Sequence, residues 1–373
     1  MAKGESIGAI AFAVVFVGIL VGGSGYLYVK YTPVDPLVQA EEHLKSARKL
    51  ANAGSFMPAV GEFSAAIQID PDLSEAYRGR GEALLNMQDF YGAINDLREA
   101  LIANPDDSAA LLLRARAYRG VEEYDNALKD LDRLLVLKPE HRATHQIIAN
   151  IHLTQGKYQS SVEHALLSLA QVPASSVTNR RLGWAYWGLE KYEDSLEPFN
   201  RAIENDPYNL HGYYGRGVTK YFLGDYEGAI EDLQEAIKND QQRTDYPHFF
   251  LFLMYLRVGD EESARTTLEI HQASRRPARN ADWPGSIGAF LLGEMTEDEL
   301  FERVNETGNP PDPELVMEGN FYAGSLRLIG GDRAGAIAFF QRCLETNIYT
   351  FYEYHSAVAE LRKLDELPES DPE

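Results

Sequence analysis

The sequence predicts an all-α fold of stacked helical hairpins, and three columns of residues predict it. The first column is a set of prolines, each 34 residues after the one before: Pro71, Pro105, Pro139, Pro173 and Pro207. The second holds small residues in the same register: Ala59, Ala93, Ala127, Ser161 and Ser195. The third holds bulkier residues: Phe63, Leu97, Leu131 and Phe199. Small side chains let helices approach, large ones fill the space beside them, and a proline ends each second helix.

A 34-residue period with these columns resembles the tetratricopeptide repeat (TPR), a pair of antiparallel helices. The resemblance implies a right-handed superhelix of helical hairpins (an α-solenoid), and arrays of this family usually act as scaffolds or adaptors that hold other proteins. We expect about seven repeats over residues 40–273, whose first helices start near Ala40, Ser74, Ser108, Arg142, Ser176 and Leu210 in the first six. Gly224 and Gly259 mark equivalent turns of the sixth and seventh repeats and lie 35 residues apart, which indicates a one-residue insertion between them.

The N-terminal segment is apolar. After a short tail over residues 1–6, the 23 residues from 7 to 29 carry no charged side chain, and a short proline-containing linker follows over 30–39. A helix of that length spans about 34 Å, enough for a hydrocarbon core of about 30 Å. We therefore predict one transmembrane helix over 7–29. A cleavable signal peptide is the alternative, with Val21-Gly22-Gly23 as its cleavage site.

Glycines within this segment and charges around it bear on its role. Gly18, Gly22 and Gly25 are spaced so that another helix could pack closely, although this spacing is frequent by chance in glycine-rich spans. The positive charges on the two sides of the segment do not decide its orientation. Counted alone they would place the large domain in the cytoplasm, but most belong to a folded helix.

The repeat pattern weakens after Ala273, and residues 274–373 form a different C-terminal part. A basic loop is followed by the elements we expect there: a spacer helix over 284–292, a short acidic helix over 297–304, one more TPR-like repeat over 317–346, a capping helix over 351–364 and an acidic tail. The succession resembles the C-terminal half of bacterial TPR lipoproteins that act as adaptors for periplasmic proteases and cell-wall hydrolases. The lipid-attachment cysteine of those proteins is replaced here by the apolar segment. The resemblance implies a single-pass protein of a bacterial inner membrane with its TPR domain in the periplasm.

Composition excludes several classes of function. The chain carries 57 acidic and 35 basic residues, a formal charge of −22, so we expect no nucleic-acid partner. Its one cysteine, Cys343, cannot form an internal disulfide. No catalytic motif occurs, so we predict no enzyme activity and no cofactor. His141, His145 and His152 have a spacing that can place ligands on one helix face, but core positions are the better interpretation, and we predict no metal.

The candidate partner-binding residues lie on the first helix of each repeat, where positions 5, 9 and 12 face the concave groove. Arginines, amides and aromatic residues occupy these positions in an otherwise acidic chain: Arg78, Arg116, Arg119, Gln146, Asn150, Arg180, Trp184, Trp187 and Tyr214. Arginine and tryptophan supply much of the binding energy at protein interfaces. The alternative is that the two tryptophans pack between repeats and that the arginines pair with neighbouring acidic residues.

These observations predict a membrane-anchored TPR scaffold or adaptor that binds a protein partner in its groove and tethers it at the membrane. A second hypothesis is a structural or assembly subunit of an integral membrane complex, with the span packed against partner helices. A complex that survives detergent purification in fixed stoichiometry would favour the second.

Overall fold

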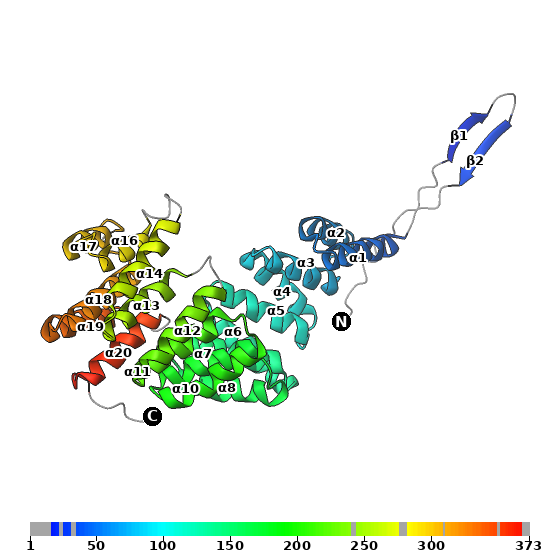
Figure 1. Cartoon of the computed structure of the whole chain (residues 1–373). Coiled ribbons are helices and arrows are strands. Elements are labelled where there is room, and N and C mark those ends of the chain that lie inside the picture. The colour runs from blue at the N-terminus through cyan, green and yellow to red at the C-terminus, as the bar shows by residue number, and fades with distance from the viewer. Residues whose placement is uncertain are drawn as a thin grey trace. The chain divides into compact units, whose positions relative to one another are not determined.

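The computed structural model describes residues 16–21, 25–30, 35–239, 244–275, 282–308, 310–348 and 351–367 (Figure 1). Its chain divides into two compact units, Met1–Pro139 (unit 1) and Glu140–Glu373 (unit 2). Antiparallel helical hairpins build both units, and the described residues contain 19 helices.

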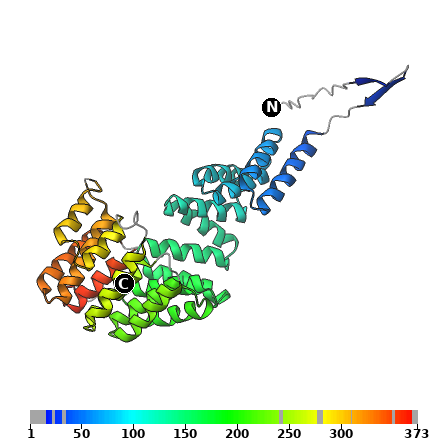
Figure 2. The same cartoon turned by 45° about the horizontal axis from the view of Figure 1, so that its top comes forward.

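Unit 1 contains three hairpins, which follow one another in chain order (Figure 2). Their helices are α1 (Pro36–Asn52), α2 (Phe56–Ile69), α3 (Ser74–Asn86), α4 (Phe90–Ala103), α5 (Ser108–Gly120) and α6 (Tyr124–Leu137). Each helix packs against the next along the chain, as expected of a repeat array.

Unit 2 continues the pattern with four more hairpins. Their helices are α7 (Arg142–Thr154), α8 (Tyr158–Gln171), α9 (Ser176–Gly188), α10 (Tyr192–Asn205), α11 (Leu210–Phe222), α12 (Tyr226–Asn239), α13 (Asp245–Arg257) and α14 (Glu261–Ser274). The first helices of repeats two to six therefore begin at the residues that the proline spacing indicates.

The turn inside each hairpin shows the period in the backbone. One residue per turn adopts positive φ, and these residues are Gly54, Gln88, Glu122, Gly156, Glu190, Gly224 and Gly259. Successive members are 34 residues apart until the last step, which is 35, as the spacing of Gly224 and Gly259 in the sequence indicates. Three members are not glycine, although a side chain in this region is strained, so the turn is set by the packing of its two helices.

The columns of small residues are the contact lines between helices. Ala59, Ala93, Ala127, Ser161 and Ser195 are fully buried. Phe63 and Phe199 hold the same place in repeats one and five, and each packs against a glycine of the next repeat. A Cβ at Gly79 would lie 2.4 Å from the Phe63 ring, and one at Gly215 would lie 2.4 Å from the Phe199 ring. The aromatic ring of one repeat therefore requires the missing side chain of the next.

A buried ion pair recurs in three repeats. Arg80, Arg114 and Arg216 each make two hydrogen bonds to the carboxylate of an aspartate 16 residues later, Asp96, Asp130 and Asp232, at 2.6–2.8 Å. These hydrogen bonds raise the pKa of all three arginines. In repeats four and five the equivalent positions hold Ile148 with His164 and Leu182 with Pro198. Pro198 thus occupies a position where the array uses a charged side chain elsewhere.

The C-terminal part of unit 2 contains the spacer, acidic, repeat-like and capping helices in the predicted order. They are α16 (Trp283–Leu291), α17 (Glu297–Asn305), α18 (Pro313–Ile329), α19 (Arg333–Glu345) and α20 (Tyr352–Lys363). Cys343 of α19 is buried, and burial raises the pKa of its thiol well above the ordinary value. The acidic tail from residue 368 onward lies outside the described residues.

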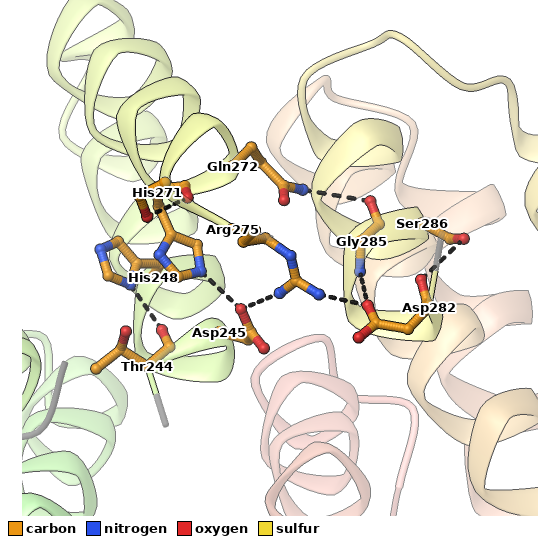
Figure 3. Close-up of polar contacts among 10 residues, drawn as sticks. Thr244, Asp245, His248, His271, Gln272, Arg275, Asp282, Gly285 and Ser286 are labelled. Carbon is orange, nitrogen blue, oxygen red and sulfur yellow. Dashed lines mark hydrogen bonds and ion pairs between the residues drawn. The ribbon is translucent and has the colours of Figure 1, made fainter. Parts of the chain in front are cut away.

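A polar cluster joins α13, α14 and α16 (Figure 3). His271 Nε2 and Asp245 Oδ1 lie 2.7 Å apart, and the guanidinium of Arg275 contacts the carboxylates of Asp245 and Asp282. His248 stacks on His271 with ring centroids 3.8 Å apart. Burial, with a smaller effect from His271, lowers the pKa of His248 to about 4, so this ring is neutral at neutral pH. The cluster has the composition of a clamp between helices, and we assign it a structural role.

The N-terminal segment differs from the predicted helix. Its described residues form two strands, β1 (Phe16–Val21) and β2 (Gly25–Lys30), which pair antiparallel with Phe16 opposite Lys30 and Val21 opposite Gly25. The segment is rich in β-branched and aromatic residues, which favour strands, and its glycines disfavour a helix. Gly18 and Gly25 lie on opposite strands, so they do not share a helix face, and Gly22 lies outside the described residues. Within the described part of the chain, no helix is long and apolar enough to cross a membrane.

Candidate protein-interaction site

The inner face of each unit is formed by the first helices of its hairpins. In unit 1, α1 contacts α3 and α3 contacts α5, while in unit 2 the same holds for α7 with α9, α9 with α11 and α11 with α13. The second helices make no comparably extensive contact with one another in the described residues. First helices therefore lie closer together, as on the concave side of a curved array. The candidate residues lie on α3, α5, α7, α9 and α11.

Arg78 on α3 is neutralised by carboxylates. Its Nη1 donates to Asp107 Oδ2 at 2.9 Å, and its Nη2 donates to Glu75 Oε1 at 3.3 Å. Glu75 also contacts Arg48 of the preceding repeat. Arg78 thus links repeats two and three, which is the alternative that the sequence left open for the arginines.

Arg116 and Arg119 on α5 have no such partner in the part of the chain that the structure describes. No hydrogen bond or ion pair joins either guanidinium to a described residue, and Arg116 is exposed. Burial and the charge of Arg116 together lower the pKa of Arg119. Two like charges are therefore held near each other without a carboxylate between them, an arrangement that an incoming anionic group would stabilise.

Three candidates of unit 2 are partly buried polar residues. Gln146 Nε2 donates to Thr178 Oγ1 of the next repeat at 3.2 Å, so this amide bridges α7 and α9. Asn150 and Arg180 instead line one cavity, described below.

The aromatic candidates are core residues. Trp184, Trp187 and Tyr214 are only 9%, 1% and 2% exposed. The sequence predicts that they face a partner in an open groove, with packing between repeats as the alternative for the two tryptophans. In the structure all three contact the chain's own C-terminal helix. Trp184 stacks on Tyr352 of α20 with ring centroids 4.1 Å apart, and Tyr214 meets the same ring edge-on at 5.0 Å. The physical reason is that a large aromatic side chain is most stable when α20 removes its surface from water.

Polar contacts hold α20 in this place. Glu360 accepts hydrogen bonds from the hydroxyl of Tyr221 on α11 and from Arg257 Nη2 on α13, the latter at 2.9 Å. Arg362 Nη2 donates to Glu190 Oε1, in the turn of repeat five, at 2.6 Å. Figure 1 shows α20, in red, between the α18–α19 hairpin and α11. The inner face of repeats five to seven is thus covered by the end of the same chain.

Two carboxyl groups are buried where α20 meets α18. Glu318 and Glu353 are 3% and 2% exposed. Glu318 accepts hydrogen bonds from the Tyr246 hydroxyl at 2.9 Å and from Trp283 Nε1 at 2.7 Å, and Glu353 accepts one from the Tyr322 hydroxyl at 3.1 Å. Burial raises the pKa of Glu353 to about 7, and burial with the charge of Glu353 raises that of Glu318 to about 8.

The sequence interpretation missed the contribution of α20 to the inner face. It identified the helix as a cap but gave no function to its aromatic residues, among them Tyr352 and His355. The signal was present in the run Phe351-Tyr352-Glu353-Tyr354, because three aromatic residues near the start of a terminal helix are more than a solvent-facing cap needs.

The comparisons agree with this architecture. The sequence profile of the family described as tetratricopeptide repeat matches residues 78–120, 112–176 and 180–245. This chain carries tetratricopeptide repeats. No significant match to this chain was found among curated proteins.

Solved structures with this repeat superimpose on the chain. A tetratricopeptide repeat protein from Parabacteroides merdae has 17% identity and a TM-score of 0.52, covering 69% of this chain and 98% of that one. MamA from Desulfovibrio magneticus has 21% identity and a TM-score of 0.44, covering 46% and 96%. YrrB, titled a TPR protein with an unusual peptide-binding site, has 17% identity and a TM-score of 0.43, covering 48% and 93%. The Parabacteroides merdae protein, whose TM-score exceeds 0.5, shows that this chain has the TPR fold.

Proposed function

We propose that the chain is a non-enzymatic TPR scaffold whose inner face in unit 1 binds an acidic segment of a protein partner. The observation that carries the proposal is the guanidinium pair of Arg116 and Arg119. Neither has a carboxylate partner among the described residues, although the chain's formal charge is −22. Other arginines of the same unit are paired: Arg78 with Asp107, Arg80 with Asp96 and Arg114 with Asp130. A partner's carboxylates would complete the pattern by charge-assisted hydrogen bonds.

Unit 1 suits this role better than the inner face of repeats five to seven. The latter contacts α20 through Trp184 and Tyr214, so a partner there would have to displace a packed helix. In unit 1 the exposed inner residues include Arg116, and no part of α20 belongs to this unit. An extended acidic segment would meet two charged donors without first removing a buried aromatic surface.

Charge reversal of the pair tests the proposal. We expect Arg116→Glu with Arg119→Glu to weaken binding of the partner that co-purifies with the full chain by at least about tenfold, because each charge-assisted contact contributes about 1.5–3 kcal/mol. Binding is measured by calorimetry after the partner has been identified by mass spectrometry.

A matched control uses two arginines on second helices of the same unit, Arg98→Glu with Arg133→Glu, whose side chains are 56% and 51% exposed. This control should leave affinity nearly unchanged. Equal loss in both double variants would mean that the array responds only to total charge, and no loss in either would remove the inner face of unit 1 as the site.

We also propose that residues 7–29 attach the scaffold to a membrane. The uncharged length of this segment supports the proposal. The resemblance of residues 283–360 to periplasmic adaptors supports a bacterial inner membrane with the array in the periplasm. A reporter fused after Glu373 that is active only in the cytoplasm would contradict this orientation.

Deletion of residues 1–31 tests the attachment. The shortened chain is expected to leave the membrane fraction and to keep its helical circular dichroism, because repeats draw their stability from their neighbours. The full chain should stay in the pellet after an alkaline wash. A full chain released by that wash would contradict insertion, and an aggregated, non-helical deletion variant would show that the segment is part of the fold.

A further inference from the structure

A cavity of about 210 Å³ lies inside unit 2, between two first helices and the C-terminal helix. Asn150 and Leu153 of α7, Arg180 and Trp184 of α9, and Tyr352 and His355 of α20 line it. The walls come from distant parts of the sequence, since Tyr158 and His355, which also meet here, are 197 residues apart. Ordinary small-molecule sites measure about 300–1,000 Å³, so this cavity suits a group about the size of one amino-acid residue.

Two walls of the cavity are fixed aromatic surfaces. Trp184 and Tyr352 stack with ring planes 26° apart, and Trp184 also meets Phe199 edge-on at 5.2 Å. His355 Nε2 and the Tyr158 hydroxyl share a hydrogen bond of 3.0 Å. The rings are held on several sides, so an apolar group could pack against them with little further ordering of the protein.

The cavity also presents the positive charge of Arg180, for which the described part of the chain supplies no counter-ion. Arg180 makes no hydrogen bond or ion pair with any residue in the described ranges, in contrast to the paired Arg216 of the next repeat. The charge of Arg180 acts electrostatically on the Tyr352 hydroxyl. Burial raises the pKa of Tyr352 to about 12, and the charge of Arg180 acts against that rise. Thr154 and Arg181 also line the cavity, and Asn150, a further polar residue of the lining, makes no side-chain hydrogen bond with described residues.

We propose that this cavity binds a carboxylate that carries a neighbouring apolar group, as at the C-terminal residue of a peptide. The Arg180 guanidinium would pair with the carboxylate, the Asn150 amide would donate a hydrogen bond, and the apolar group would pack on Trp184 and Tyr352. A singly charged carboxylate fits better than a phosphate, because the negative field of the whole chain opposes a second charge. The proposal rests on the proposed function in one respect: the peptide belongs to a protein partner.

The first experiment titrates the full chain with N-acetylphenylalanine and with its amide, followed by calorimetry and tryptophan fluorescence. The acid is expected to bind about tenfold or more tightly than the amide, which cannot form the ion pair. Equal affinities would overturn the carboxylate assignment, and so would inorganic phosphate that competes as well as the acid does.

Variants locate the binding. Arg180→Gln should weaken binding of the acid by about tenfold or more, whereas Arg180→Lys, which keeps the charge, should retain part of the affinity. Arg201→Gln is the matched control, because Arg201 lies on α10 with its side chain 55% exposed. If the control and Arg180→Gln lose affinity equally, the cavity is not the site. Melting temperatures of all variants identify any that fail to fold, and binding to Arg180→Lys then decides.

A third comparison separates a protein terminus from a free organic acid. A hexapeptide that ends in phenylalanine with a free carboxylate should bind more tightly than N-acetylphenylalanine, since further residues add contacts. Equal affinity would assign the cavity to a free acid and overturn the peptide terminus. The proposed function is tested separately, because the charge-reversal variants of Arg116 and Arg119 change residues of α5 in unit 1 and leave this cavity intact.

Discussion

Replacing Trp187 by alanine is expected to lower the free energy of unfolding of unit 2 by about 3–5 kcal/mol, the usual result of truncating a large buried aromatic side chain. Trp187 is 1% exposed and contacts Tyr192, Phe222 and His355 with ring centroids 5.0–6.0 Å apart. Its partners belong to two repeats and to α20, so the cavity left behind would weaken three contacts at once. Urea denaturation followed by circular dichroism measures the change.

The control for this prediction is Tyr208→Ala, an aromatic residue of unit 2 that is 79% exposed and should contribute little. The sequence offered a different interpretation, in which Trp187 faces a partner. If Trp187→Ala leaves the midpoint of urea unfolding unchanged and reduces partner binding, Trp187 contacts a partner and the prediction is wrong. Similar losses in both variants would show that unit 2 is sensitive to any aromatic truncation.

The periodic part of the fold could be predicted because each of its determinants is local. The spacing of Pro71, Pro105 and the later prolines indicates where second helices end, and small residues such as Ala93 mark where helices cross. Interactions of this kind lie within one repeat or between neighbours, so they recur at a fixed sequence distance. The 35-residue step between Gly224 and Gly259 is visible in the sequence for the same reason.

The recurring ion pair was also accessible from the sequence. Arg80 and Arg114 are 34 residues apart, and each is followed by an aspartate 16 positions later, Asp96 and Asp130 respectively. This column lies outside positions 5, 9 and 12 of the first helices, so a prediction based on the inner face does not include it. Its members are held by neutralising hydrogen bonds inside a hairpin and are unavailable to a partner.

The covered inner face of unit 2 could not be predicted in the same way. Contacts between α20 and the array join residues such as Tyr158 and His355, 197 positions apart, and they occur once, so no period reports them. A groove position is exposed in an open array and buried once another helix fills the groove. Whether Trp184 binds a partner or packs in the core thus depends on the chain end, not on its own repeat.

The N-terminal segment illustrates a different limit. Apolar length indicates a transmembrane helix only if the backbone is helical, and a run of valine, isoleucine and tyrosine is also compatible with strands. Hydropathy does not separate the two, and the described residues of this segment pair as β1 and β2.

Raising the pH from about 6.5 to about 9 is expected to destabilise unit 2 by an amount on the order of a few kcal/mol, through Glu318 and Glu353. Both pKa values are raised in the folded chain, to about 8 and about 7, above the ordinary carboxyl value of 4.5. The folded state thus holds protons that the unfolded state has already released. Stability from these groups is complete below the unfolded pKa and is lost as the pH rises through the folded values.

Burial, mutual repulsion and hydrogen bonds together determine the pKa values of Glu318 and Glu353. Burial is the main cause of both shifts, and the pair's mutual repulsion adds to the rise at Glu318. Hydrogen bonds from Trp283, Tyr246 and Tyr322 act the other way, because they favour the ionised form. His248 does not change the stability of the fold in this window. Its pKa is lowered to about 4, so the stability that the neutral ring contributes is lost only in acid, between about pH 6.5 and 4.

Glu353→Gln tests the assignment, because the amide keeps an acceptor for the Tyr322 hydroxyl and cannot ionise. The variant should melt at a higher temperature than the parent at about pH 9 and show a flatter stability profile above about pH 6.5. Glu204→Gln, an exposed residue of α10, is the matched control and should follow the parent. If the stability of the parent protein stays constant from about pH 6.5 to 9, the two carboxyl groups ionise without destabilising the fold, which would contradict the prediction. Because Glu353 lies on α20, the same titration followed by tryptophan fluorescence reports whether the helix leaves Trp184 and Trp187 as the pair ionises.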